Sequence, residues 1–325
     1  MGENRGKSTG VAAAIVAFAV LVAGLGAYTI GRTSQRQDER APGRTGGGGT
    51  AGVSLERRVT DFTASFHAGS GYRPPGRAER TAVADAVGLI LDGHLDRARP
   101  LLADVDFRLR TLTDSGTGRR YAELSDRTED GPAPRGWGRV YIDLSGPVRW
   151  SVQVPHPVAD LDTERIGARV LLGSPGGIMV LAGAHRRAGA GNAADMAHRT
   201  DSVFDAVCDE LVRRRLPGVQ VHGFADASAP GYDVVASTGR GDAGRADGRR
   251  LAGALAAHGF TVCRAWTRAS CPLEGRDNVQ GRRAAADDLT FLHVEFARSV
   301  RADAVRRDRV ADAVTTVTAR WARRA

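Results

Sequence analysis

The sequence predicts an α/β protein with a mostly parallel or mixed central sheet and helices on both faces. Beyond Gly136, short runs rich in β-branched and aromatic residues alternate with longer segments whose apolar residues recur at helical spacing. Such helical segments are the usual connections between parallel strands. Strands are expected near residues 148–154, 177–183, 218–221, 232–237, 260–266 and 289–296, and helices near 161–171, 194–216, 243–258 and 300–323.

The first 52 residues are predicted to anchor this domain. Residues 11–30 form an uninterrupted apolar run, and a helix needs about 20 such residues to cross a bilayer. We interpret the run as a transmembrane signal anchor, preceded by a cytoplasmic tail at residues 1–10 and followed by a flexible, glycine-rich linker at residues 31–52. The main domain is then extracytoplasmic, attached to the cell membrane by a single pass. A cleaved signal peptide is the alternative, because small residues lie near the end of the run.

Residues 53–135 are predicted to form a small helical entry module. Apolar residues at helical spacing run from Glu79 to Ala103 and are interrupted by Gly93, which predicts a hairpin of two short helices. A turn cluster at residues 131–134 then precedes a strand-like run that begins at Trp137. The α/β metallohydrolase-like domain is therefore expected to span residues 136–325.

The net charge of +9 would favour nucleic acid if the basic residues were clustered. Arginine is instead spread over the whole chain and Lys7 is the only lysine, so we expect no nucleic-acid partner. Three cysteines are too few for a disulfide framework. Cys263 and Cys271 are close enough to pair in an oxidising compartment, which leaves Cys208 as a small apolar residue on a predicted helix.

Three predicted strands run into a histidine, namely His156, His185 and His222. In α/β sheets, ligands bind beyond the carboxyl ends of the strands, where the loops converge. Catalytic zinc takes three protein ligands from imidazoles and carboxylates and keeps one position open for water. We predict a zinc site with His156, Asp160 and His222 as ligands, and with Glu164 and His185 as alternative ligands. A cap on the following helix is the competing interpretation of Asp160.

His293 and Glu295 lie two residues apart on the last predicted strand and therefore on one face. A glutamate buried in an apolar strand is costly unless it has a partner or a task. Beside a metal, Glu295 would act as the catalytic general base by taking a proton from bound water. An edge strand with its polar face in water is the competing interpretation.

Polar residues near the same edge are candidates for substrate binding. Arg186 follows a predicted strand and has the planar donor group that binds a carboxylate in two places. His198 and Ser202 are expected one turn apart on the predicted helix at residues 194–216. Solvated arginines, or a histidine that caps the helix, would explain the same pattern without a substrate. The predicted substrate-binding residues are His185, Arg186, His198, Asn278 and His293.

The order of these motifs resembles the zinc carboxypeptidase-like hydrolases, nearest the N-formylglutamate amidohydrolase and poly-γ-glutamate hydrolase branch. The matching elements, between residues 150 and 301, are Pro155-His156-Pro157 with Asp160, Val221-His222-Gly223-Phe224, and His293-Val294-Glu295-Phe296. The carboxypeptidase pattern has a glutamate three residues after the first histidine. Ala159 stands at that position here, and Asp160 follows it. The resemblance implies an α/β fold, zinc as cofactor and hydrolysis of an amide or peptide bond.

The sequence therefore favours a membrane-anchored, extracytoplasmic, zinc-dependent amidohydrolase or carboxypeptidase-like enzyme. Its substrate would be a peptide or amide of the cell envelope, or a γ-glutamyl compound. A non-catalytic envelope binding protein on a hydrolase-like fold is the alternative. A metal-dependent phosphoesterase is a third possibility, but it would need more carboxylates at strand ends than the sequence contains.

Overall fold

In the computed structural model, the described residues are 52–131, 133–267 and 271–323. They belong to one compact unit, Thr50–Ala325. The predicted tail and signal anchor lie outside the described residues, as does the predicted linker except for Gly52. Within the described ranges, no helix combines the length and the apolar character that a membrane crossing requires.

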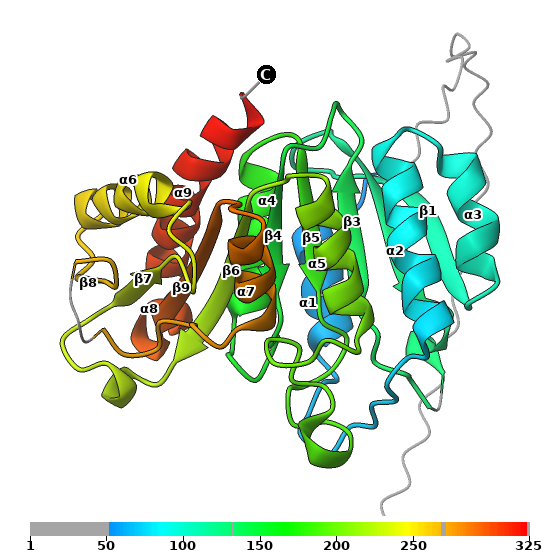
Figure 1. Ribbon diagram of the computed structural model, residues 1–325, viewed down its shortest axis with the longest axis horizontal. Helices are drawn as coiled ribbons and strands as arrows, with labels where there is room; N and C mark the ends of the chain where they lie inside the picture. Colours follow the sequence, from blue (N-terminus) through cyan, green and yellow to red (C-terminus); the bar gives the residue numbers. More distant parts are fainter. Residues whose placement is uncertain (1–51, 132, 268–270, 324–325) are drawn as a thin grey trace, which may run out of the picture. The chain divides into compact units, whose positions relative to one another are not determined.

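Nine strands of the described chain form a single mixed sheet in the order β1-β2-β3-β5-β4-β6-β9-β7-β8 (Figure 1). The four central strands β5, β4, β6 and β9 run parallel, so their carboxyl ends share one edge, whereas β3 and β7 are antiparallel to their central neighbours. The strands are β1 Phe107–Thr113, β2 Arg120–Asp126, β3 Arg139–Asp143, β4 Trp150–Val154, β5 Gly177–Leu181, β6 Gly218–Phe224, β7 Val234–Ser237, β8 Val262–Arg264 and β9 Phe291–Ala297.

Helices cover both faces of this sheet, as predicted. In the view of Figure 1, α2, α5 and α7 lie in front of the sheet and α1 and α4 lie behind it. The front group comprises α2 Arg77–Leu91, α3 Leu95–Ala103, α5 Val203–Arg213 and α7 Val279–Ala286. The back group comprises α1 Leu55–Thr63, α4 Thr163–Gly173, α6 Arg245–Ala257, α8 Arg298–Ala302 and α9 Ala304–Ala322. Each face has its own apolar core, because every buried strand presents alternate residues to the two helical layers.

The segment that was predicted as a helical entry module contains two strands as well as helices. Its helical hairpin is present as α2 and α3, which pack against each other. The strands β1 and β2 follow, and β2 pairs with β3, so the predicted boundary after residue 135 falls between two paired strands of one sheet. In β1, Phe107-Arg108-Leu109-Arg110 alternates apolar and charged residues, a strand pattern that the prediction of a helical module overlooked, and in β2 Glu123 interrupts the apolar run.

The helix predicted at residues 194–216 is shorter than expected. It begins at Val203, and Ser202 is its N-cap, whose hydroxyl oxygen accepts a hydrogen bond from the Asp205 amide at 3.0 Å. His198 therefore lies in the preceding turns and not on the helix. The predicted pairing of His198 and Ser202 on one helical face is wrong, because Ser202 is a good N-cap and the helix begins only after it.

Candidate metal centre

The carboxyl edge of the central parallel strands gathers the predicted ligands. His156 is two residues beyond the end of β4 and only 1% exposed, while His222 lies in β6. Glu295 lies in β9 directly opposite His222, because β6 and β9 pair in register. The loop after β4 turns back at once: the Asp160 amide donates to the His156 carbonyl at 3.0 Å, and Val158 adopts a positive φ of 65°. This turn brings Asp160 beside His156.

Both predicted histidine ligands lie close to one carboxylate oxygen, Asp160 Oδ2. It lies 3.3 Å from His156 Nδ1 and 3.4 Å from His222 Nδ1. Zinc binds nitrogen and oxygen at about 2.0–2.2 Å, so tetrahedral geometry separates two ligand atoms by roughly 3.3 Å. The two measured separations match this value, and ligand atoms of all three residues lie within 4.8 Å of one another. The three residues therefore form a candidate zinc site.

The second nitrogen of His156 is held by a residue that sequence reasoning missed. Asp195 Oδ1 lies 2.7 Å from His156 Nε2, and since a carboxylate only accepts, Nε2 carries the hydrogen. Nδ1 is thereby directed at Asp160. Asp195 is itself held by Arg186 at 2.8 Å and lies 3.1 Å from His198 Nδ1. The only signal for it in the sequence is its place three residues before His198.

The pKa values of Asp160 and His156 depend on each other, because the two side chains are hydrogen-bonded. Burial lowers the pKa of His156, but hydrogen bonds to Asp160 and Asp195 outweigh burial and raise it. Burial raises the pKa of Asp160, but the hydrogen bond from His156 and the proximity of His222 outweigh burial and hold it well below its usual range. The raised pKa of His156 favours a proton on this ring beside the carboxylate. A metal ion would replace that proton.

His222 is buried between the other rings of the site. Burial lowers its pKa to about 4, so the ring is neutral at pH 7, which is the form that binds metals. Its Nε2 lies 2.6 Å from Gln220 Oε1. The His293 ring stacks on it with a centroid separation of 4.5 Å, and the His156 ring meets it edge-on at 5.0 Å.

Glu295 and His293 both carry a polar atom that lacks a hydrogen-bond partner within the described part of the chain. These atoms are Glu295 Oε2 and His293 Nδ1. Burial, followed by the charge of Asp160, raises the pKa of Glu295 to about 8. His293 Nε2 lies 4.0 Å from Glu295 Oε1, and His222, His293 and Glu295 form a second group with ligand atoms within 4.8 Å of one another. A buried carboxyl group without a partner is costly, which is the pattern expected of a functional residue.

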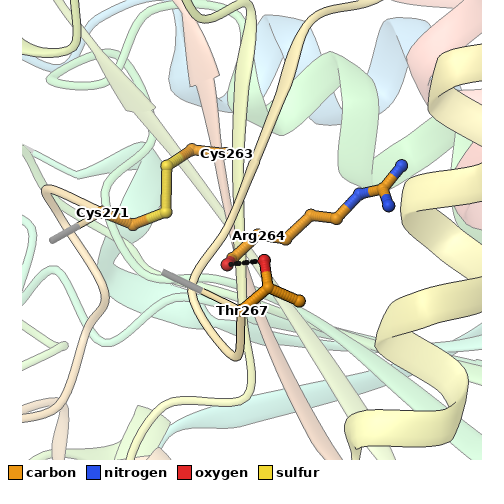
Figure 2. Close-up of a disulfide and its surroundings, with 4 residues drawn as sticks. All are labelled: Cys263, Arg264, Thr267 and Cys271. Atoms are coloured by element: carbon orange, nitrogen blue, oxygen red, sulfur yellow. Dashed lines mark hydrogen bonds between the residues drawn. A yellow bond between two sulfur atoms is a disulfide. The ribbon is translucent and has the colours of Figure 1, made fainter. Parts of the chain in front are cut away.

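These groups open into a cavity of about 610 Å³. One wall consists of residues 271–278, in which Gly275 lies against the His293 ring so closely that a Cβ atom would approach the ring to 2.4 Å. Cys263 and Cys271, whose pairing the sequence left open, form a disulfide that joins this wall to β8 (Figure 2). The cavity is lined by His156, Arg186, Ala197, His198, His222, Cys271, Leu273, Glu274, Gly275, Arg276, Asp277, Asn278, His293 and Glu295.

Four of the five predicted substrate-binding residues line this cavity, namely Arg186, His198, Asn278 and His293. The fifth, His185, is not among the lining residues, and its Nδ1 accepts a hydrogen bond from the Arg187 amide at 3.1 Å. The alternative ligand Glu164 lies in the first turn of α4, where it accepts from the Val158 amide at 3.4 Å. Neither alternative ligand belongs to the two groups of converging ligand atoms.

Comparison with known proteins gives structural neighbours but no sequence match. No protein-family model and no curated protein matches the chain. Similar solved structures include a bacteriophage poly-γ-glutamate hydrolase, with a TM-score of 0.38 and 11% identity over 60% of this chain and 94% of that one. A metallo-carboxypeptidase from Pseudomonas aeruginosa is also similar, with a TM-score of 0.37 and 14% identity over 66% of this chain and 76% of that one. Another, from Burkholderia cenocepacia, has a TM-score of 0.36 and 12% identity over 66% of this chain and 64% of that one. The motifs in the sequence resemble these same classes of enzyme.

Proposed function

We propose that this protein is a zinc-dependent hydrolase of an amide or peptide bond. The observation that carries the proposal is the convergence of Asp160 Oδ2 with the Nδ1 atoms of His156 and His222, each of which lies from that oxygen at the separation expected in a tetrahedral zinc site. In each ring, Nε2 already faces an acceptor, so both Nδ1 atoms are available for a cation.

The chemistry follows from the residues around these ligands. Zinc, when bound, polarises the scissile carbonyl and lowers the pKa of water. Glu295 lines the same cavity with an unpartnered oxygen and would take a proton from water and pass it to the leaving amine. A nearby divalent cation favours the ionised carboxylate, which offsets the effect of burial on Glu295. The buried His293 stacks on His222 and thereby keeps bulk water from that side of the ring.

The cavity supports a substrate that carries a carboxylate. Arg186 and Arg276 line it, and its volume of about 610 Å³ lies in the range of small-molecule and peptide sites. An arginine beside a catalytic cavity binds carboxylates through two parallel hydrogen bonds. We therefore propose a cell-envelope peptide or a γ-glutamyl compound as the substrate class.

We also propose an extracytoplasmic location with a membrane anchor at residues 11–30. The disulfide between Cys263 and Cys271 supports an oxidising compartment, since such bonds are rare in the cytosol of most organisms. The apolar run at residues 11–30 and the glycine-rich linker support the anchor.

Metal analysis of the full-length protein, purified in detergent without chelators, tests the proposal. We expect one zinc ion per chain in the native protein and loss of zinc in His156→Ala and His222→Ala. A native chain that holds no stoichiometric metal contradicts the proposal. Stoichiometric zinc without turnover of envelope peptides or γ-glutamyl compounds would favour the non-catalytic binding protein instead.

A further inference from the structure

Behind His222 lies a buried array of four amide side chains. Gln153 and Gln220 stand side by side on β4 and β6, which pair in register at these residues. Asn278 and Gln280 approach them from the N-terminal end of α7. None of the four is more than 3% exposed. Because buried amides must satisfy their hydrogen bonds within the protein, the direction in which each one points has consequences for its neighbours.

The orientation of Gln280 follows from a backbone group. Its Nε2 lies 3.0 Å from the Met196 carbonyl oxygen and 2.7 Å from Asp205 Oδ1. A backbone carbonyl only accepts, so the NH₂ end of Gln280 must face Met196. The oxygen end of Gln280 then faces Gln220 and accepts from Gln220 Nε2 at 3.1 Å. The NH₂ end of Gln220 is thereby directed away from His222.

A second backbone group leads independently to the same orientation. Asn278 Oδ1 lies 2.9 Å from the Gly281 amide nitrogen, which only donates, so the oxygen end of Asn278 must face Gly281. The NH₂ end of Asn278 then donates to Gln220 Oε1. The contact with Gln153 is consistent with this orientation of Gln220, since Gln153 Oε1 accepts from Gln220 Nε2 at 3.0 Å. A backbone carbonyl cannot donate and a backbone amide cannot accept. The oxygen and NH₂ ends of every amide in the array are therefore assigned.

The orientation of the Gln220 amide determines which nitrogen of His222 carries the hydrogen. Gln220 Oε1 faces His222 Nε2 at 2.6 Å, and two acceptors cannot approach so closely without a hydrogen between them. Nε2 must therefore donate, and Nδ1 of the neutral ring is left as an acceptor facing Asp160 at 3.4 Å. The tautomer of a histidine ligand is generally set by the hydrogen bond at its other nitrogen.

We propose that Gln220 is a positioning residue that holds neutral His222 in its Nε2–H tautomer, with Gln280 and Asn278 determining which end of the Gln220 amide faces the ring. The inference deepens the proposed function, because this tautomer presents Nδ1 to a metal. The tautomer itself is a property of the metal-free protein. It can therefore be tested even if the protein binds no zinc.

The first measurement is the tautomer of His222 in the metal-free, full-length protein. With ring nitrogens labelled by ¹⁵N, two-bond nitrogen–proton correlation spectra at pH 7 distinguish a protonated from an unprotonated nitrogen, and the resonances lost in His222→Asn assign the ring. We expect Nε2 to be protonated in the native chain and both tautomers to appear in Gln220→Met, which removes the acceptor. Gln220→Glu, which keeps an acceptor at this position, should restore the single tautomer.

The second measurement is zinc affinity, determined by competition with a chelator. Loss of an outer partner of a histidine ligand typically weakens metal binding about 10–100-fold, and we expect this for Gln220→Met. Gln153→Met is the matched control, because Gln153 belongs to the array but bonds to Gln220 and not to His222. We expect its zinc affinity to stay within a few-fold of native.

An Nδ1–H tautomer in the native chain would overturn the inference, as would an unchanged tautomer in Gln220→Met. Thermal unfolding of each variant checks that it is folded. If Gln220→Met does not fold, Gln220→Leu serves in its place, because it also removes the acceptor that faces His222 Nε2. A single Nε2–H tautomer in that variant would then count against the proposal. If the native chain binds no zinc, the proposed function fails while the tautomer measurement still decides this inference.

Discussion

The two faces of β4, β6 and β9 differ in kind although the same strands build both. Toward α4 and α9, β4 and β6 present only apolar side chains such as Val152, Val219 and Val221. Toward α5 and α7, the alternate positions carry Gln153, Gln220 and His222, and β9 adds His293 and Glu295. One face is a core, and the other is a buried polar site with a fully paired amide array behind it.

This difference shows how the candidate site is held in place. Side chains on buried strands have little freedom, and a site on such elements is more precise than one on loops. Burial of polar groups is costly, and the amide array offsets the cost because its members bond to one another. Glu295 and His293 are the exceptions on this face, since Glu295 Oε2 and His293 Nδ1 have no such partner in the described ranges. Of these two, Glu295 is the candidate general base, because a carboxylate can take a proton from water.

Glu295→Gln should have the largest effect on the polar face. It removes the proposed base while keeping size, so turnover should fall by about 10²–10⁴-fold, the usual contribution of general acid–base catalysis. Zinc content should stay at one per chain. Glu56→Gln on α1 is the control, because Glu56 is not among the residues that line the cavity and should leave turnover close to native. Equal loss in both variants would remove Glu295 from the mechanism.

A pair of substitutions on adjacent residues of β6 tests the division between the faces. His222→Ala should abolish zinc binding at micromolar concentrations, because it removes a ligand. Val221→Ala, on the apolar face, should leave zinc affinity near native but lower the free energy of unfolding by about 2 kcal/mol through lost burial and a cavity. Zinc titration and denaturant unfolding of both variants provide the comparison. A large loss of zinc affinity in Val221→Ala would show that the two faces are not separable.

The stability of the metal-free protein should depend on pH through Glu295. Its pKa in the folded chain is raised to about 8, above its value in the unfolded chain. Between pH 5 and 8 the unfolded chain therefore loses this proton while the folded chain keeps it, so stability falls as pH rises. The raised pKa of His156 acts in the same direction. Denaturant unfolding should show a smaller decline in Glu295→Gln than in the native chain, and an identical decline would mean that Glu295 ionises normally.

The fold class and the central ligands were within reach of the sequence. Alternation of strand-like and helical runs predicted the α/β class, and apolar runs that end in or contain histidine predicted the meeting of His156, Asp160 and His222. Local spacing carries this information, because a strand has a period of two and parallel strands end at one edge. The sequence left the pairing of Cys263 with Cys271 open, since closeness in the chain permits a disulfide but does not require one.

The supporting residues depend on contacts between distant segments, and only the tertiary structure decided them. Asp195 reaches His156 across 39 positions, and Gln280 reaches Gln220 across 60. Period-two spacing puts Gln220 and His222 on one face, but which strand and which helix meet that face depends on the strand order. The sequence by itself therefore determined which residue types would form the candidate metal site. The strand order and register decided which nitrogen of each histidine faces the metal position, because the partners that orient the rings come from elsewhere in the chain.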